Sequence, residues 1–330
     1  MQIAPIAPCV PHWRTLERAS EMPQVDDHML RCVAFLGEGG GSSFRATGTC
    51  SFAFVKVDEY DFIYLITAGH VVWPHRRTRA PKPSDPIALR VNQHDSDPKV
   101  IPLNRGEWIF PDDVHFDICA FEFDPAIYNQ DRKLIYSEMD LQTITFAVKA
   151  DECEKFGVKS MPDHWKVTIG DDVFITGAFI SRIGDKSNIP ILRAGTVAAL
   201  PHEPVEYYSP RHAAYLIETR SLGGISGSPV FLNTSRSLPR GTNVAQRTEG
   251  GVRFPYGLIG MVLGTSGSSE YIKDFDPPAE EQKTDADFNS GISIVLPARR
   301  ILEFLYSDPF SDSMAAAVER RRQIAGLREH

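Results

Sequence analysis

Three polar residues, His70, Asp117 and Ser226, follow one another along the chain in an order that could support acyl transfer. A serine hydroxyl is a poor nucleophile at neutral pH unless a base takes its proton, and that base is commonly a histidine oriented by a carboxylate. Each of the three residues alone has an ordinary structural explanation, at a strand end, in a turn or in a flexible loop. Their occurrence together in this order favours a catalytic interpretation.

Ser226 lies in a turn between two apolar segments, residues 215–219 and 229–232, which we predict as strands. The glycines of this turn are Gly223, Gly224 and Gly227. A simple hairpin needs only one or two residues with positive φ. A turn this rich in glycine can also point its backbone N–H groups at an anion, as a developing oxyanion requires. A flexible surface loop is the alternative interpretation of the stretch by itself.

The other two residues also stand in recognisable surroundings. His70 follows Tyr-Leu-Ile-Thr-Ala-Gly, an apolar strand pattern ending in small residues, and Asp117 precedes the apolar run Ile-Cys-Ala-Phe. With the turn Gly-Ile-Ser-Gly-Ser-Pro around Ser226, the chain resembles the chymotrypsin-like (trypsin-fold) serine proteases. That family has a His, Asp, Ser order, a T-A-x-H motif, an aspartate leading a buried strand and a G-x-S-G-x-P turn. The resemblance covers roughly residues 28–306.

The resemblance implies a serine endopeptidase that hydrolyses peptide bonds through an acyl-enzyme. Ser226 would be the nucleophile, His70 the general base and then acid, and Asp117 the group that orients the imidazole. The N–H groups of Gly224 and Ser226 would form the oxyanion hole. The residues implied in substrate binding are Arg220, Leu263, Gly264, Thr265 and Gly291. The alternative is a catalytically silent or partner-activated protein of this fold that acts as a binding or scaffold module.

The resemblance leads to specific expectations for the substrate site. Residues 263–265 would form a strand edge that pairs with the substrate backbone. Gly291 would leave the specificity pocket open, and Arg220 would lie near the floor of that pocket. A cation there could favour an acidic residue before the scissile bond. A salt bridge to Glu218, or simple exposure, is the alternative for Arg220.

Composition limits the other functional classes. The chain has 330 residues, of which 42% are hydrophobic, and its net charge is −8 at pH 7. A general nucleic-acid binder is therefore not expected, and no apolar run is long enough to span a bilayer. No cysteine or histidine pair has metal-ligand spacing and no cofactor motif occurs, so we expect no metal and no cofactor. A polypeptide substrate and a possible activating protein are the expected partners.

The five cysteines, Cys9, Cys32, Cys50, Cys119 and Cys153, show no paired spacing. Secreted members of the resembled family bridge the strand before the catalytic histidine to the following residue, which here is Val71. We therefore expect a cytoplasmic protein with reduced thiols. Ile225 replaces the aspartate of zymogen-type members, and no Ile-Val-Gly-Gly start precedes the first barrel. Activation by N-terminal cleavage is thus not expected.

Short segments rich in Val, Ile and Phe, separated by turn residues, predict an all-β fold. With the resemblance, the fold class is two six-stranded antiparallel β-barrels with C-terminal helices. The expected divisions are an irregular arm at 1–27, a first barrel with His70 and Asp117 at 28–125, a linker, second barrel and closing helix at 126–306, and a terminal helix at 307–330. The first barrel's expected strands are 29–36, 49–57, 62–67, 87–91 and 117–123, and the second's are 172–176, 191–199, 213–219, 229–232, 257–264 and 291–296. The terminal helix is expected to pack on the body.

A basic segment follows the catalytic histidine. Residues 74–86 contain His75, Arg76, Arg77, Arg79 and Lys82. Such a run is usually a solvated surface, which is our prediction here. A role in binding a partner or substrate is the alternative.

Overall fold

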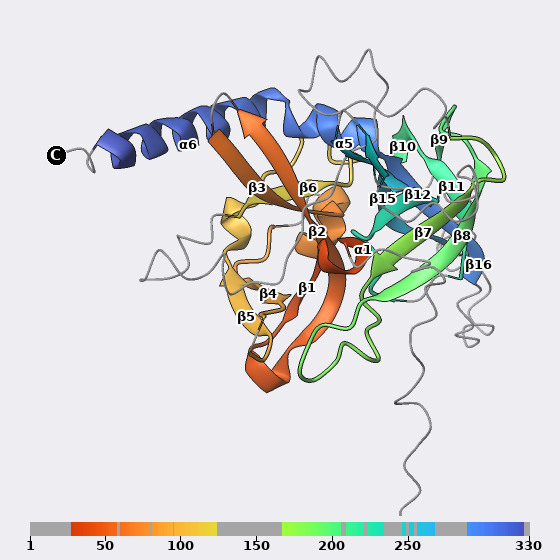
Figure 1. Ribbon diagram of the computed structural model, residues 1–330, viewed down its shortest axis with the longest axis horizontal. Helices are drawn as coiled ribbons and strands as arrows, with labels where there is room; N and C mark the ends of the chain where they lie inside the picture. Colours follow the sequence, from red (N-terminus) through yellow and green to blue (C-terminus); the bar gives the residue numbers. More distant parts are fainter. Residues whose placement is uncertain are drawn as a thin grey trace, which may run out of the picture.

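The computed structural model describes residues 28–57, 60–78, 81–94, 96–123, 167–205, 209–220, 223–233, 246–248, 251–253, 256–267 and 289–326. The predicted N-terminal arm, most of the crossing between the barrels, Cys9 and Cys153 lie outside these residues. Two β units stand side by side, the first in red to yellow and the second in green to blue (Figure 1).

Six antiparallel strands form the first sheet, in the order β5-β4-β1-β2-β3-β6. Their bounds are Val33–Glu38 (β1), Arg45–Val57 (β2), Tyr60–Thr67 (β3), Ile87–Val91 (β4), Lys99–Leu103 (β5) and Cys119–Glu122 (β6). Ile109, which follows β5, pairs with Ala120 of β6 through backbone hydrogen bonds of 2.8 and 3.0 Å. This single bridge draws the two edges together without a continuous ladder. The first unit is therefore a half-barrel, whereas the sequence predicted a full one.

The second unit is a closed barrel with the order β11-β16-β15-β12-β7-β8. Its strands are Asp172–Gly177 (β7), Ile191–Ala199 (β8), Tyr215–Glu218 (β11), Pro229–Asn233 (β12), Tyr256–Gly267 (β15) and Asn289–Pro297 (β16). Two small hairpins accompany it, made by Pro204–Val205 (β9) with Ser209–Ala213 (β10), and by Gln246–Thr248 (β13) with Gly251–Arg253 (β14). Alternate apolar residues such as Val173 and Ile175 point into the barrel and are fully buried.

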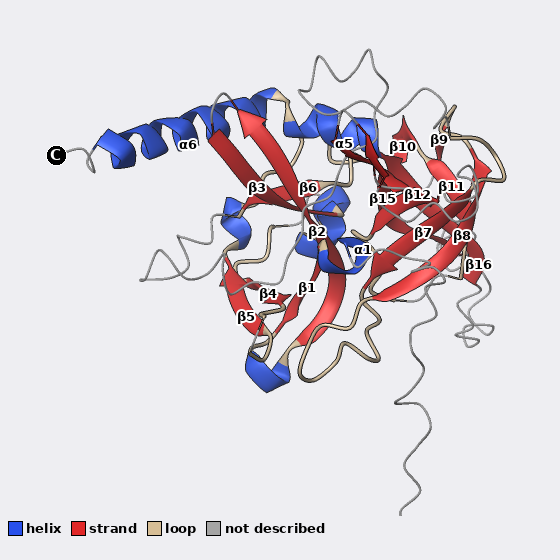
Figure 2. Ribbon diagram, in the orientation of Figure 1, coloured by secondary structure: helices blue, strands red, loops and turns tan. Residues whose placement is uncertain are grey.

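Six short helical elements and one long helix, α6, complete the described part of the fold (Figure 2). They are His28–Arg31 (α1), Gly41–Ser43 (η2), Gly69–Val72 (α2), Arg76–Thr78 (η3), Arg105–Glu107 (η4), Ala298–Leu305 (α5) and Asp308–Gly326 (α6). The predicted closing helix is α5, which begins after Pro297 and buries Ile301 and Leu302. Helix α6 lies over the first sheet, where the Phe310 ring packs edge-on to Tyr64 at 5.1 Å. The terminal helix thus packs on the body, as expected.

Every predicted strand overlaps an observed strand, with ends that differ by at most four residues, whereas β5 and the hairpin strands β9, β10, β13 and β14 were not predicted. Residues 29–36 begin with the helical turn α1, so that β1 starts only at Val33. Strand β6 begins at Cys119, two residues after Asp117. Strand β5 was not predicted because Pro102 interrupts it. It lies at the edge of the sheet, where a proline is tolerated since a missing N–H breaks no ladder.

A buried arginine ties the two units together. Arg90 of β4 is 6% exposed and donates hydrogen bonds to the Gly184 and Asp185 carbonyls at 2.8 and 3.0 Å. It also donates to the side chain of Asn188 at 2.7 Å. The amide of Asn188 in turn donates to the Arg90 carbonyl at 2.7 Å. The loop between β7 and β8 is therefore fastened to the first sheet.

Candidate active site

His70 and Asp117 form a close pair in the first unit. The His70 Nδ1 lies 2.7 Å from Asp117 Oδ2, and the His70 backbone N–H donates to Asp117 Oδ1 at 2.9 Å. Gly69 permits this approach, because a Cβ at that position would lie 3.0 Å from Oδ1. With Nδ1–H donating to the carboxylate, Nε2 is left as the acceptor, which is the tautomer that a general base needs.

The Asp117 carboxyl is ionised at neutral pH despite its burial. Burial by itself raises the pKa of this carboxyl, but the charge and hydrogen bonds of His70 and the nearby Arg77 guanidinium outweigh it. The resulting pKa lies below the ordinary value of 3.8. The carboxylate therefore stabilises the fold fully above about pH 4, and this contribution is lost as the pH falls through the lower folded value.

The loop that carries Ser226 is docked on the first sheet. Buried Thr49 of β2 donates its backbone N–H to the Ser226 carbonyl at 2.9 Å and its hydroxyl to the Gly224 carbonyl at 2.8 Å. The same hydroxyl accepts the Ala178 N–H at 2.8 Å. Thr67, three residues before His70, donates to the Thr49 carbonyl at 2.7 Å. The serine loop thus lies against the strands that lead to His70.

The two backbone donors predicted for the oxyanion hole belong to Gly224 and Ser226 of this loop. Gly224 and Gly227 have φ of +96° and +84°, which favour glycine. Among the described residues, neither the Gly224 N–H nor the Ser226 N–H donates to a protein acceptor. Ile180 packs against Gly224, because a Cβ on Gly224 would lie 2.7 Å from the Ile180 Cγ1. Both N–H groups therefore remain available to a ligand.

The Ser226 hydroxyl does not bond to the imidazole in this structure. It donates instead to the Leu263 carbonyl at 3.3 Å, and no hydrogen bond between Ser226 and His70 occurs among the described residues. An O–H···O distance of 3.3 Å is at the weak end of the range. Catalytic hydrogen bonds in unliganded sites are often long and tighten only with substrate.

At residues 263–265, one side of strand β15 pairs with no other strand within the described residues. Strand β15 pairs with β12 only as far as Met261, whereas its pairing with β16 continues to Gly267. Val262 then pairs with the turn, since its carbonyl accepts the Gly227 N–H at 2.8 Å. A polypeptide strand could add beside Gly264 and Thr265.

Gly291 and Arg220 lie near the end of β11. Gly291 has a φ of +73°, and among the described residues the atom nearest to a Cβ there would be the Thr219 carbonyl oxygen at 3.9 Å. The described part of the chain thus leaves room for a substrate side chain beside Gly291. The Arg220 side chain is exposed, and its carbonyl accepts a hydrogen bond from Arg193 of β8. Its role in choosing acidic substrates stays a prediction.

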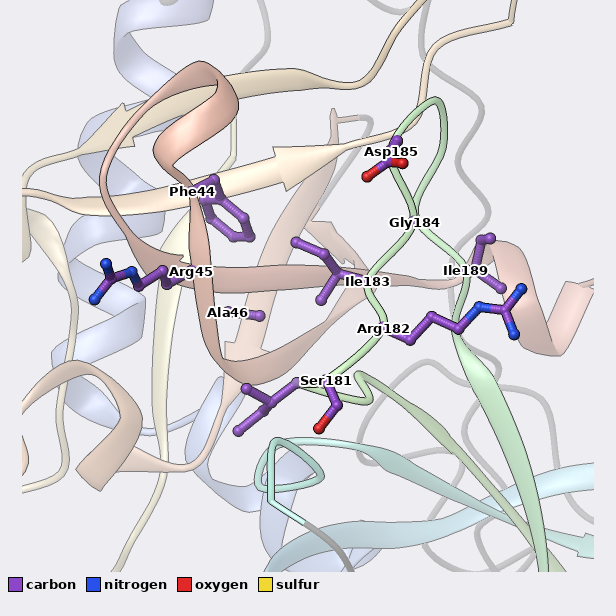
Figure 3. A pocket seen from close by; sticks show the side chains of 10 residues that line it. Phe44, Arg45, Ala46, Ser181, Arg182, Ile183, Gly184, Asp185 and Ile189 are labelled. Carbon is purple, nitrogen blue, oxygen red and sulfur yellow. The ribbon is translucent and has the colours of Figure 1, made fainter.

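A pocket of about 630 Å³ adjoins the loop that carries Ser226, because Ile180 lines the pocket and also packs against Gly224. Its walls come from both units, with Phe44 and Ala46 on one side and Ile183 and Ile189 on the other (Figure 3). Two of the lining residues, Ile180 and Ile189, are 46% and 44% exposed, which is unusual for large apolar side chains in the described part of the chain. The pocket could hold an apolar group of a ligand.

Sequence reasoning missed several residues around the site. Thr49 and Ile180 carry no local signal, because their roles depend on contacts with the opposite unit. The prediction of a solvated basic segment is wrong for Arg76, which is 6% exposed. Lys82 also lies over an aromatic ring, 4.7 Å from the centroid of Phe110.

Thr49→Val is expected to lower the free energy of unfolding by about 2–4 kcal/mol, because the Ala178 N–H and the Gly224 carbonyl each lose a buried partner. Urea unfolding measures the loss. Thr47→Val is the matched control, since Thr47 is exposed and its hydroxyl makes one long hydrogen bond, of 3.4 Å, to the Leu36 carbonyl, and we expect a loss of about 0.5 kcal/mol or less. Equal losses in the two variants would contradict the bridging role of Thr49.

Other features of the described residues are simple. No group of histidine, cysteine and acidic side chains among them could hold a metal ion. Within the same residues, no helix is both long and apolar enough to cross a membrane. Cys32, Cys50 and Cys119 are free thiols in buried positions, and burial raises the pKa of each thiol.

Neither a protein-family model nor a curated protein matches this sequence. Several solved structures are similar in fold. The MamO protease domain from Magnetospirillum magneticum (apo form) is 13% identical, with a TM-score of 0.43 over 85% of this chain and 98% of that one. Deg5 is 12% identical, with a TM-score of 0.45 over 86% of this chain and 92% of that one. Human heparin binding protein is 9% identical, with a TM-score of 0.42 over 85% of this chain and 92% of that one. These likenesses concern the fold alone.

Proposed function

We propose that this chain is a serine endopeptidase, a trypsin-like hydrolase that cleaves polypeptides through a Ser226–His70–Asp117 triad. The observation that carries the proposal is the 2.7 Å contact between His70 Nδ1 and buried Asp117, because it places the ring proton on Nδ1 and makes Nε2 the nitrogen that can accept a proton. The docking of the Ser226 loop on Thr49 supports the proposal, because it holds the nucleophile's loop to the unit that carries the base.

In the proposed mechanism, His70 Nε2 takes the Ser226 hydroxyl proton as Oγ attacks the scissile carbonyl. The N–H groups of Gly224 and Ser226 would hold the oxyanion, a contribution of about 3–4 kcal/mol for one donor. His70 would then protonate the leaving amine, and water would release the acyl group by the reverse sequence. The substrate backbone would pair beside Gly264 and Thr265.

One observation favours a second candidate function. The Ser226 hydroxyl donates to the Leu263 carbonyl and must leave it before His70 can take its proton. A protein of this fold that stays silent, or that becomes active only when a partner shifts this loop, would show such an arrangement. We also propose a cytoplasmic location, for which the unpaired buried cysteines Cys32, Cys50 and Cys119 give support.

Covalent labelling by a fluorophosphonate probe tests the proposal. The purified protein is expected to be labelled, Ser226→Ala to remain unlabelled, and His70→Ala to react about 10³-fold more slowly or worse. Ser96→Ala is the matched control, because this serine is exposed in the loop between β4 and β5 and should leave labelling unchanged. A folded but unlabelled parent protein would rule out constitutive hydrolysis and leave the silent or partner-activated candidate.

A further inference from the structure

The Asp117 carboxylate has a second cationic neighbour besides the catalytic histidine. The Arg77 Nη2 lies 3.7 Å from Asp117 Oδ2, the same oxygen that His70 Nδ1 contacts at 2.7 Å. The Arg77 and His70 side chains are 34% and 35% exposed, whereas that of Asp117 is only 7% exposed. A buried carboxylate is thus shared between an imidazole and a guanidinium.

The neighbouring residue, Arg76, fixes the position of Arg77. Arg76 and Arg77 share the short helical turn η3, and Arg76 is buried. The Arg76 guanidinium donates to the Asp113 and Phe116 carbonyls at 3.3 Å each, and also to the Pro111 carbonyl. Arg76 therefore clamps η3 to the segment that ends at Asp117, which keeps Arg77 beside the carboxylate.

We propose that Arg77 is a positioning residue of the catalytic pair, which holds Asp117 ionised and opposes the positive charge that His70 gains when it takes up a proton. This inference rests on the proposed function. The sign follows from Coulomb's law. Asp117 favours the imidazolium, whereas the guanidinium 3.7 Å from the same oxygen offsets part of that attraction. His70 therefore stays a neutral base to lower pH than Asp117 alone would allow.

The other charged groups near the pair act more weakly on it. Within the described residues, Arg77 is the one guanidinium within 4 Å of an Asp117 oxygen. Arg76 is directed at backbone carbonyls, and its charge interacts with those of Asp112, Asp113 and Asp117. The Asp113 carboxylate contacts His212 of β10 at 3.1 Å, so its ion-pair partner lies in the second unit. Burial and the adjacent Asp117 raise the pKa of the Cys119 thiol, which leaves it neutral.

Arg77→Gln tests the inference by an NMR titration of the His70 ring, with its signals identified by comparison with His70→Gln. The titration midpoint is expected to rise by roughly 0.5 pH unit, because a partly exposed ion pair has a modest energy. Arg77→Lys keeps a cation and is expected to shift by less than half as much. Arg182→Gln removes an exposed arginine of the β7–β8 loop and should leave the midpoint unchanged.

In Arg77→Gln, the pH at which the fluorophosphonate labelling rate falls to half on the acid side is expected to rise together with the NMR midpoint. An Arg77→Gln midpoint equal to that of the parent protein, or an equal shift in Arg77→Lys, would overturn the inference. The NMR titration needs no activity. A protein that fails to be labelled would therefore refute the proposed hydrolysis while the electrostatic role of Arg77 is still decided by the titration.

Discussion

Asp117→Asn is expected to slow fluorophosphonate labelling of Ser226 by about 10⁴-fold while leaving the protein folded. Asparagine has the size of aspartate but presents an amide donor. If its NH₂ faces His70 Nδ1, the imidazole must carry its proton on Nε2 and cannot accept the Ser226 proton. The 2.7 Å contact between His70 Nδ1 and Asp117 Oδ2 makes this change of tautomer direct. The second-order labelling rate constant, measured from pH 6 to 9, is the quantity to compare.

Asp113→Asn provides the matched control for this prediction. Asp113 lies four residues before Asp117 but contacts His212 at 3.1 Å. Its replacement is expected to change the labelling rate by less than about threefold, because it does not touch the catalytic imidazole. A rate for Asp117→Asn within tenfold of the parent would show that the aspartate does not set the histidine tautomer.

Gly227→Ala is expected to destabilise the protein by about 3 kcal/mol or more. A Cβ on Gly227 would lie 2.0 Å from the Thr49 carbonyl oxygen and 2.3 Å from Thr67 Oγ1. The backbone cannot easily yield, because the Gly227 N–H donates to the Val262 carbonyl at 2.8 Å and Thr49 is bonded to Ser226. The φ of +84° adds the strain of a left-handed conformation, about 1–2 kcal/mol, to the overpacking.

Gly170→Ala separates the cost of the steric overlap from the cost of the left-handed backbone conformation. Gly170 has a similar φ of +90°, but nothing lies within 4 Å of its Cβ position. We therefore expect it to lose only the conformational part, about 1 kcal/mol. Urea unfolding of both variants gives the comparison. Equal losses would mean that the contact between the serine loop and the first sheet is looser than the structure describes.

The two experiments also bear on the silent candidate. The docking of the serine loop affects stability whether or not the protein cleaves a substrate, whereas the Asp117 prediction requires a working nucleophile. A protein that is destabilised by Gly227→Ala but never labelled would have an assembled site that stays inactive. The hydrogen bond from Ser226 to Leu263 would then be the first contact to disrupt.

The sequence by itself determined the all-β class, most strand positions and the identity and order of His70, Asp117 and Ser226. These features are local. Alternating apolar residues specify strands, and a serine among glycines specifies a turn with positive φ, whatever the rest of the chain does. The closure of the first sheet was not predictable in this way, because one bridge between Ile109 and Ala120 depends on how the whole sheet curls.

Only the tertiary structure decided how the candidate catalytic groups are held. The hydroxyl of Thr49 reaches the Gly224 carbonyl across 175 positions of sequence, and no pattern near either residue signals that contact. The basic run after His70 likewise gave no indication that Arg76 turns inward while Arg77 faces Asp117. The physical reason is the same in both cases. The direction of a side chain in a loop is set by the surface that packs against it, and that surface comes from distant segments of the chain.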